Sequence, residues 1–360
     1  MRIILLVTAA LVLLVQTPVF AQSCNCSEQF DWLQQKLALN YAGYRDKVTE
    51  DTRPDFERHT ASYQEKIAAS STDTSCYRLM SAWVKWLRDG HLYLGYKDTP
   101  RVENPDSIRR RFADRERIAL PLPFSIKQPD AVTLVLRVAP IRYDKRQVLD
   151  SLIKANRRLL ERTPNLIIDC RGNRGGSDMT FAELRPYVYS GTARGLSRKV
   201  YSTRDNIEMY VLLQKNKRYS RSQRRSYGRL VKMMKKHEGS FIGNCEIRKN
   251  RPEKISPYPK KVAILIDRGC AGSCEEFIYY ARQSSRVTLI GQNTAGVMDY
   301  GNVHYIDFPC GKFTVGYPTA RSCRVDAGQG IDGTGIPPAV RIDDDKTDWV
   351  AFAKAYLEQK

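Results

Sequence analysis

Apolar residues recur every three or four positions in the first hundred residues of the chain. The two clearest runs are Phe30, Leu33, Leu37 and Tyr41, and Met80, Trp83, Val84 and Leu87. Residues with this spacing share one face of a helix, so each run predicts a helix with a single buried side. We therefore expect an N-terminal helical subdomain over residues 22–96. A polar, charged and proline-punctuated stretch over 97–130 is typical of a linker or loop region.

The second half of the chain alternates short apolar runs with helical patterns. Strands are predicted at 131–138, 166–170, 262–266 and 287–290, and helices at 148–160, 180–189 and 274–282. Strands that alternate with helices favour a parallel sheet with crossover helices, which is an α/β core, here assigned to residues 131–345. A hairpin at 303–308 and 313–317 and a closing helix within 346–360 complete the expected organisation.

The N-terminus has the features of a signal peptide. Arg2 precedes an apolar run from Ile3 to Val15, and Val19-Phe20-Ala21 has the small-residue spacing of a cleavage site. We expect residues 1–21 to be removed and the protein to be periplasmic or secreted. No later stretch approaches the roughly 20 apolar residues of a membrane span, so no transmembrane segment is expected after leader removal. The second-ranked alternative is a lipoprotein anchored at Cys24, for which Gln22 is a poor match.

Nine cysteines in an exported chain indicate disulfide bonds, and their odd number leaves at least one cysteine outside an internal pair. Their connectivity stays open at this stage. Cys24 with Cys26, and Cys270 with Cys274, have the close spacing of metal-binding pairs. Neither has a second pair at the spacing of a zinc site, so we predict no metal and no cofactor.

The formal net charge of +20 is concentrated in a basic insertion over residues 194–240. One interpretation is attraction to an anionic envelope polymer or to lipid headgroups. The interpretation we favour is a solvated helical insertion with a charged face. Nucleic acid is not an expected partner, because export removes the usual target and no recognised binding motif accompanies the charge.

Two turns, each placed between a predicted strand and a predicted helix, carry the candidate chemistry. The first is Asp169–Gly176, whose glycines let backbone N–H groups point into a cleft, as in a phosphate nest or an oxyanion hole. The second is Asp267–Phe277, in which Ser273 lies at the expected helix N-terminus. A serine there is suited to nucleophilic catalysis, but serine is equally favoured as a simple helix cap.

Together with two later blocks, these turns resemble the tail-specific, C-terminal-processing serine peptidases. The four matching blocks are 166–176, the strand and turn that end at Glu275, 291–296, and 332–338. The resemblance implies a ClpP/crotonase-like spiral of β-β-α units and cleavage of extended or unfolded polypeptides. It also implies roles for specific residues: Ser273 as nucleophile, His91 as general base, Asp332 as its acidic partner, and Gly175, Gly176, Gly272 and Cys274 as oxyanion-hole or substrate-binding positions.

Members of this family use either a Ser-Lys dyad or a Ser-His-acid triad. The lysine of a dyad would fall near Val297 or Met298, neither of which can act as a base, so the dyad is excluded. The triad is supported by Asp89-Gly90-His91, which resembles the family's Asp-Gly-His block. The plainer alternatives are a packed histidine at position 91 and, for Asp332, a turn residue that bonds its own backbone.

The sequence departs from the family pattern at the position of the nucleophile, and this departure leaves two possible functions. Ungapped counting from Glu275 places the family's nucleophilic serine on Gly272, one position before Ser273. Either the turn is rearranged so that Ser273 reaches His91, or the protein is a non-catalytic peptide-binding or envelope scaffold on the same fold. A thiol nucleophile from Cys270 or Cys274 is less expected than a disulfide at these positions. A crotonase-like acyl-CoA enzyme is improbable for an exported protein, because CoA thioesters are intracellular.

Overall fold

A computed structural model describes residues 24–97, 124–138, 146–176, 178–217, 219–343 and 347–359. The predicted signal peptide and most of the predicted linker lie outside these residues. The end of the predicted linker, Phe124–Lys127, forms strand β2, so in that part the linker assignment was wrong. Among the described residues no helix combines the length and apolar character that crossing a membrane requires.

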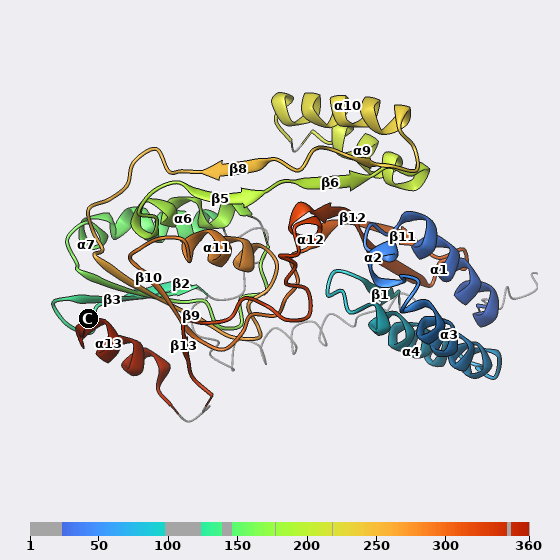
Figure 1. The fold of residues 1–360 in the computed structure, drawn as a ribbon, viewed down its shortest axis with the longest axis horizontal. Coiled ribbons are helices and arrows are strands. Elements are labelled where there is room, and N and C mark those ends of the chain that lie inside the picture. Colours follow the sequence, from blue (N-terminus) through green and yellow to red (C-terminus); the bar gives the residue numbers. More distant parts are fainter. Residues whose placement is uncertain are drawn as a thin grey trace, which may run out of the picture.

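The N-terminal unit is helical, in agreement with the predicted periodicity (Figure 1). Its elements are α1 (Cys26–Asn40), α2 (Tyr44–Lys47), α3 (Arg53–Ala68), α4 (Asp73–Trp83) and the 3-10 helix η1 (Val84–Leu87). Both apolar runs of the sequence analysis are buried in one cluster. The side chain of Asn25 caps α1, and that of Thr72 caps α4, because each accepts a hydrogen bond from an amide of the first turn.

The helices pack against an antiparallel sheet and share one hydrophobic core with it. In that sheet β12 (Phe313–Ser322) pairs with β1 (Tyr93–Tyr96), β6 (Arg198–Tyr201) and β11 (Tyr300–Asp307), and β6 pairs with β7 (Phe241–Ile242). Phe308, Phe313, Val315 and Tyr317 pack in the same buried cluster as the helices. The predicted hairpin is therefore longer than expected, and it is part of the core of the N-terminal unit.

The second unit is a six-stranded sheet in the order β13-β10-β9-β4-β3-β2. Its strands are β2, β3 (Thr133–Val138), β4 (Asn165–Asp169), β9 (Lys261–Ile266), β10 (Val287–Gly291) and β13 (Val340–Arg341). All neighbouring pairs are parallel except β2 with β3. This confirms the predicted α/β architecture with parallel strands.

Helices cover both faces of this sheet, which explains its continuous apolar strands. One face packs against α6 (Arg146–Ala155), α7 (Arg157–Leu160), the 3-10 helix η2 (Asp178–Leu184), α8 (Arg185–Val188) and α11 (Ser273–Ala281). The other face packs against α13 (Trp349–Gln359). The helix predicted over 180–189 is thus a 3-10 helix followed by one short α-helical turn.

The basic insertion contains strands as well as helices, and it links the two units (Figure 1). Its helices are α9 (Arg204–Lys215) and α10 (Arg221–Lys236). Before α9, β5 (Ala193–Leu196) runs into β6. After β7, β8 (Ile247–Asn250) returns and pairs with β5 as an antiparallel ribbon. The expected helical insertion over residues 194–240 therefore also contains β6 and most of β5.

Three disulfides join parts of the chain that are distant in sequence. They are Cys24–Cys310, Cys26–Cys76 and Cys245–Cys323. Cys170, Cys270 and Cys274 are free and buried, so the expected disulfide at Cys270 and Cys274 was wrong. Both thiols have raised pKa values. Burial is the main cause for Cys274. For Cys270 the largest single effect is a hydrogen bond with Cys274 that lowers the pKa, and burial together with repulsion from Cys170 and Asp267 outweighs it. They are correspondingly poor nucleophiles.

The Cys24–Cys310 bond is expected to stabilise the N-terminal unit, because it closes a loop of 286 residues between the start of α1 and the β11–β12 turn. The double substitution Cys24→Ser and Cys310→Ser should lower the free energy of unfolding by about 2–5 kcal/mol. Chemical denaturation followed by tryptophan fluorescence measures this change. Ser62→Ala, on the exposed side of α3, is a control that should leave stability unchanged. An unaltered denaturation midpoint in the double variant would contradict this role.

Candidate functional site

The two predicted turns meet because β4 and β9 are adjacent parallel strands, whose carboxyl ends lie at one edge of the sheet. The Gly172 amide donates to Asp267 Oδ1 at 2.8 Å, and the Ala271 amide donates to the Asn173 carbonyl at 3.0 Å. The contact is close enough that a Cβ added to Gly175 would lie 2.5 Å from the Ala271 carbonyl oxygen. Only glycine fits there, which accounts for the glycine-rich first turn.

The other two family blocks join the same site. After β10, the Ala295 amide donates to the Cys270 carbonyl at 2.8 Å. The Gly333 amide donates to the Gly296 carbonyl at 3.1 Å, which brings in the turn that follows Asp332. Four segments that are far apart in sequence therefore share one edge of the α/β unit.

Gly272 occupies the position and the backbone conformation of a nucleophile elbow. Its φ of 58° and ψ of −120° lie in a region that residues with a side chain rarely adopt, and it directly precedes α11. A Cβ at residue 272 would lie 3.8 Å from His91 Nε2. A serine hydroxyl, one bond further out, could then reach the roughly 2.6–3.2 Å of a Ser–His pair. The position that points toward the imidazole therefore carries no side chain.

Ser273 is the first residue of α11, and its side chain lies against the glycine turn. An ideal Cβ on Gly175 would be 3.2 Å from Ser273 Oγ. The Oγ atom is buried and has no hydrogen-bond partner among the described residues. The structure therefore brings Ser273 into the site but not into a hydrogen bond with His91. Ser273 also does not act as the helix cap, because the residue preceding the helix is Gly272.

His91 enters the site from the N-terminal unit. It follows Gly90, where an added Cβ would lie 2.7 Å from the side chain of Val297, so the two units are in close contact here. The His91 amide donates to Asp89 Oδ1 at 2.8 Å, while the ring atom Nδ1 is buried without a hydrogen-bond partner in the described chain. Burial lowers the pKa of His91, against an opposing effect of Asp89, so the imidazole is neutral near pH 7.

Asp332 is held near Asp89 by backbone amides. Its Oδ1 accepts hydrogen bonds from the amides of Met298 at 3.1 Å and Asp299 at 3.0 Å. Its Oδ2 lies 3.9 Å from Lys47 Nζ and has no hydrogen-bond partner among the described residues. Burial, followed by repulsion from Asp89, raises the pKa of Asp332 to about 7. Asp332 and His91 therefore form no hydrogen bond in this structure.

Sequence reasoning missed three residues that organise this site. Tyr41 donates from its hydroxyl to Asp89 Oδ2 at 2.7 Å, Lys47 is the cation nearest to Asp332, and Glu275 is fully buried beneath the elbow. Glu275 Oε1 accepts from Thr294 Oγ1 at 2.6 Å and from the Gly296 amide at 2.7 Å, and Oε2 accepts from two further amides. In the sequence, Glu275 ends the second family block and lies three residues after Gly272, which is the acidic position of a capping box.

The predicted oxyanion-hole residues are only partly available. The amide of Gly175 donates to Asn173 Oδ1 at 2.9 Å, that of Gly272 to Glu275 Oε2 at 3.1 Å, and that of Cys274 to the Ala271 carbonyl at 3.2 Å. The Cys274 side chain is fully buried. Gly176 is exposed, and it lines the groove described next. Three of the four expected positions therefore already use their N–H groups inside the protein.

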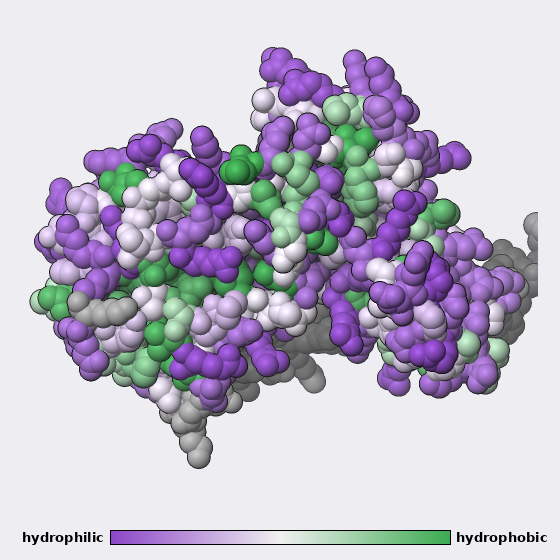
Figure 2. Space-filling view, in the orientation of Figure 1, coloured by the Kyte–Doolittle hydropathy of each residue, from purple (hydrophilic) through white to green (hydrophobic). Residues whose placement is uncertain are grey.

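A groove with a volume of about 1320 Å³ opens from the elbow toward the basic insertion. Its inner end is formed by His91, Gly272 and Ser273, and its outer wall includes residues of β8 and α9. Hydrophobic side chains lie among hydrophilic ones between the two-helix lobe and the α/β unit (Figure 2). A groove of this size and mixed lining fits an extended polypeptide segment better than a small metabolite.

Comparison with known proteins shows which protein family this sequence matches. Residues 133–342, more than half of the chain, match peptidase family S41. The matched region extends from β3 to the end of β13 and contains the elbow, Glu275 and Asp332, but it does not include His91.

Solved structures with the same fold span both units. Mature CPAF in complex with lactacystin is 12% identical, with a TM-score of 0.63 and coverage of 93% of this chain and 97% of that chain. A protein from Parabacteroides merdae is 14% identical, with a TM-score of 0.59 and coverage of 93% and 97%. A lipoprotein from Streptococcus agalactiae is 11% identical, with a TM-score of 0.51 and coverage of 95% and 99%. At these identities the likeness establishes the fold.

The raised pKa of Asp332 predicts a specific dependence of stability on pH. The pKa of Asp332 is about 7 in the folded protein against the ordinary 3.8 of an aspartate, so the folded protein holds a proton that the unfolded chain releases between these values. The wild type should therefore lose stability relative to Asp332→Asn as pH rises from 4 to 7, by on the order of 3 kcal/mol in total. Urea denaturation of both proteins at several pH values measures the difference, and a difference that does not vary over this window would refute the assignment.

Proposed function

Because the chain belongs to peptidase family S41 and carries glycine at the elbow, we propose that it binds extended polypeptide segments in its groove without hydrolysing them. The protein has the fold of the tail-specific peptidases, while its proposed activity is recognition. The observation that carries this proposal is the position of Gly272, whose missing side chain would point toward His91 Nε2.

The hydrogen bonds of the elbow support the same proposal. Stabilisation of a tetrahedral intermediate needs amide donors aimed at the developing oxyanion. The amides of Gly175, Gly272 and Cys274 already donate to acceptors within the protein. The site thus lacks a side chain at the nucleophile position, and three of its four predicted donor positions are already used. The amide of Ser273, which follows the elbow, donates no hydrogen bond within the described chain.

The alternative is catalysis by Ser273, with His91 as base and Asp332 as its acidic partner. In its favour, Ser273 Oγ is buried at the inner end of the groove and makes no competing hydrogen bond within the described chain. This mechanism requires the elbow to move until Ser273 replaces Gly272 opposite His91. That movement would break the bonds between Glu275 and the elbow, so we rank this function second.

We also propose that the protein acts outside the cytoplasm. Three disulfides in the described residues are typical of an oxidising compartment. Cys24 is bonded to Cys310, so its sulfur would not be available for lipid attachment, which favours a periplasmic or secreted protein over a lipoprotein.

The elbow assignment can be tested by restoring a hydroxyl. Wild-type protein should not react with a labelled fluorophosphonate, whereas Gly272→Ser should become labelled, because its Oγ would lie within reach of His91. The positive φ costs this variant roughly 1–3 kcal/mol of stability, so its fold is checked by circular dichroism. Labelling is measured on gels and by mass spectrometry of the modified peptide.

Two controls separate the competing functions. In the Gly272→Ser background, His91→Ala should abolish labelling, because it removes the base. In the wild-type background, Ser273→Ala should change nothing. Labelling of the wild type that disappears in Ser273→Ala would show that Ser273 is a nucleophile, and the non-catalytic proposal would then be abandoned.

A further inference from the structure

We propose that the groove selects polypeptide segments that carry acidic side chains beside apolar ones, and that Arg248 and Lys249 recognise their carboxylates. This inference rests on the proposed function of peptide binding and adds the class of segment. Both residues belong to β8 and line the outer part of the groove. Both are exposed, and in the part of the chain that the structure describes neither takes part in an ion pair.

The carboxylate already present in the groove does not neutralise these two cations. Glu276 is the acidic residue of the lining, and its Oε2 lies 3.4 Å from Arg198 and 3.8 Å from the buried Arg324. Its charge is thus balanced by Arg198 and Arg324. The charge of β8 remains available for an anionic ligand.

The pairing of β5 with β8 places like charges opposite each other. Arg194 is the cross-strand partner of Lys249, and Gly195 is the partner of Arg248. Neither strand contains an acidic residue. Like charges directly opposite in an antiparallel pair repel each other and destabilise the ribbon. A carboxylate bound beside Lys249 would weaken this repulsion. Arg248 lies on the other face of the ribbon, with Gly195, toward Tyr280.

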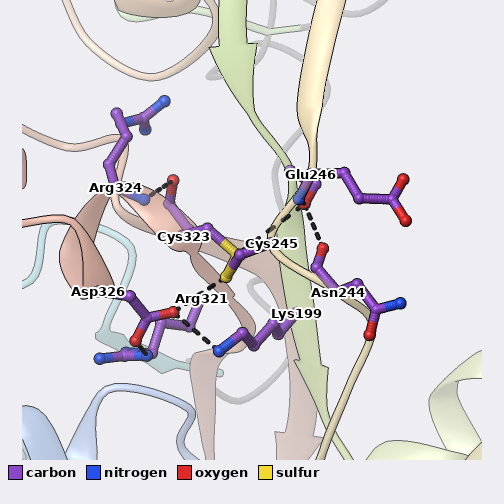
Figure 3. The surroundings of a disulfide bond; sticks show 10 residues. Lys199, Asn244, Cys245, Glu246, Arg321, Cys323, Arg324 and Asp326 are labelled. Atoms are coloured by element: carbon purple, nitrogen blue, oxygen red, sulfur yellow. Dashed lines mark hydrogen bonds and ion pairs between the residues drawn. A yellow bond between two sulfur atoms is a disulfide. The ribbon is translucent and has the colours of Figure 1, made fainter.

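Two features hold the charged strand in place next to apolar surface. The segment that leads into β8 is fixed by the Cys245–Cys323 disulfide, beside Asp326 and its ion pair with Lys199 (Figure 3). Beneath β5, an added Cβ at Gly195 would lie 2.4 Å from the Tyr280 hydroxyl, so this ring forms the floor of the ribbon. Burial raises the pKa of Tyr280 to about 12, so the floor is neutral and does not compete with an incoming carboxylate.

Apolar contacts distinguish the groove from the other basic surface of the protein. Helix α10 carries seven basic residues and no acidic one, and its hydrophilic side chains project from the top of the molecule (Figure 2). Such a face attracts anions in general. The groove instead combines the two cations of β8, and Arg185 and Arg198 further along its lining, with Phe277, Tyr280 and the apolar residues of α9. This combination favours a segment with both acidic and apolar side chains.

The experiment compares fluorescein-labelled twelve-residue peptides that share their apolar and aromatic residues. One contains four Glu, a second has Gln at these positions, and each is made with a free and an amidated C-terminus. Fluorescence anisotropy with the full chain should show roughly fivefold tighter binding of the Glu peptide. In Arg248→Gln/Lys249→Gln this preference should fall to about one. The matched control Lys232→Gln/Lys235→Gln, which removes the same charge from α10, should keep it.

Each outcome has a distinct meaning. Equal binding of Glu and Gln peptides would overturn this inference and leave the proposed peptide binding intact, whereas failure of every peptide to bind would reject the proposed function itself. If both double variants lose the preference for the Glu peptide to the same extent, the overall charge of the protein explains the preference. The role of β8 is then overturned. A preference only for the free acid over the amide would place the recognised carboxylate at the chain end, and selection of acidic side chains would be rejected.

Discussion

The buried carboxylate of Glu275 is the interaction on which the site depends. It accepts hydrogen bonds from the amides of Gly272, Gly296 and Val297 and from the hydroxyl of Thr294, so both oxygens are satisfied within the protein. A buried charge is tolerated only when it is compensated in this way. One side chain thus fixes the elbow to the loop after β10. Val297 in turn contacts Gly90, which sets the position of His91.

This scaffold explains how the elbow can persist without a nucleophile. In a peptidase, a serine at a positive-φ elbow is a cost in stability that catalysis justifies. Glycine adopts the same φ of 58° without that cost, and the hydrogen bonds of Glu275 involve backbone amides rather than the side chain at 272. The geometry of the groove is therefore independent of the residue that would perform the chemistry. Loss of catalysis and retention of binding are compatible on physical grounds.

The sequence predicted the α/β unit well and the organisation of the N-terminal unit only in part. Strands β4, β9 and β10 are continuous apolar runs followed by glycine-containing turns. This pattern lies within a few consecutive residues, so it can be recognised from the sequence alone. The shared core of α1 and β12, the disulfide partners and the return of β8 to β5 depend on contacts between distant segments. Ungapped counting placed the elbow on Gly272 but could not exclude a rearranged turn in which Ser273 faces His91. The backbone angles of Gly272 and the direction of its absent Cβ decide for Gly272.

The protonation states of the site follow from the same burial that shapes it. His91 Nδ1 and Asp332 Oδ2 are both buried without hydrogen-bond partners among the described residues, and Ser273 Oγ shares this condition. An unsatisfied buried polar atom costs about 1–3 kcal/mol, so native cores contain few of them. Burial lowers the pKa of His91 and raises that of Asp332, which keeps the imidazole neutral and favours a protonated acid up to about pH 7. A working triad also uses a neutral imidazole, but it needs an ionised acid bonded to that imidazole. Together, these unpaired atoms and the protonated acid favour a pocket that receives a polar ligand over a complete Ser-His-Asp triad.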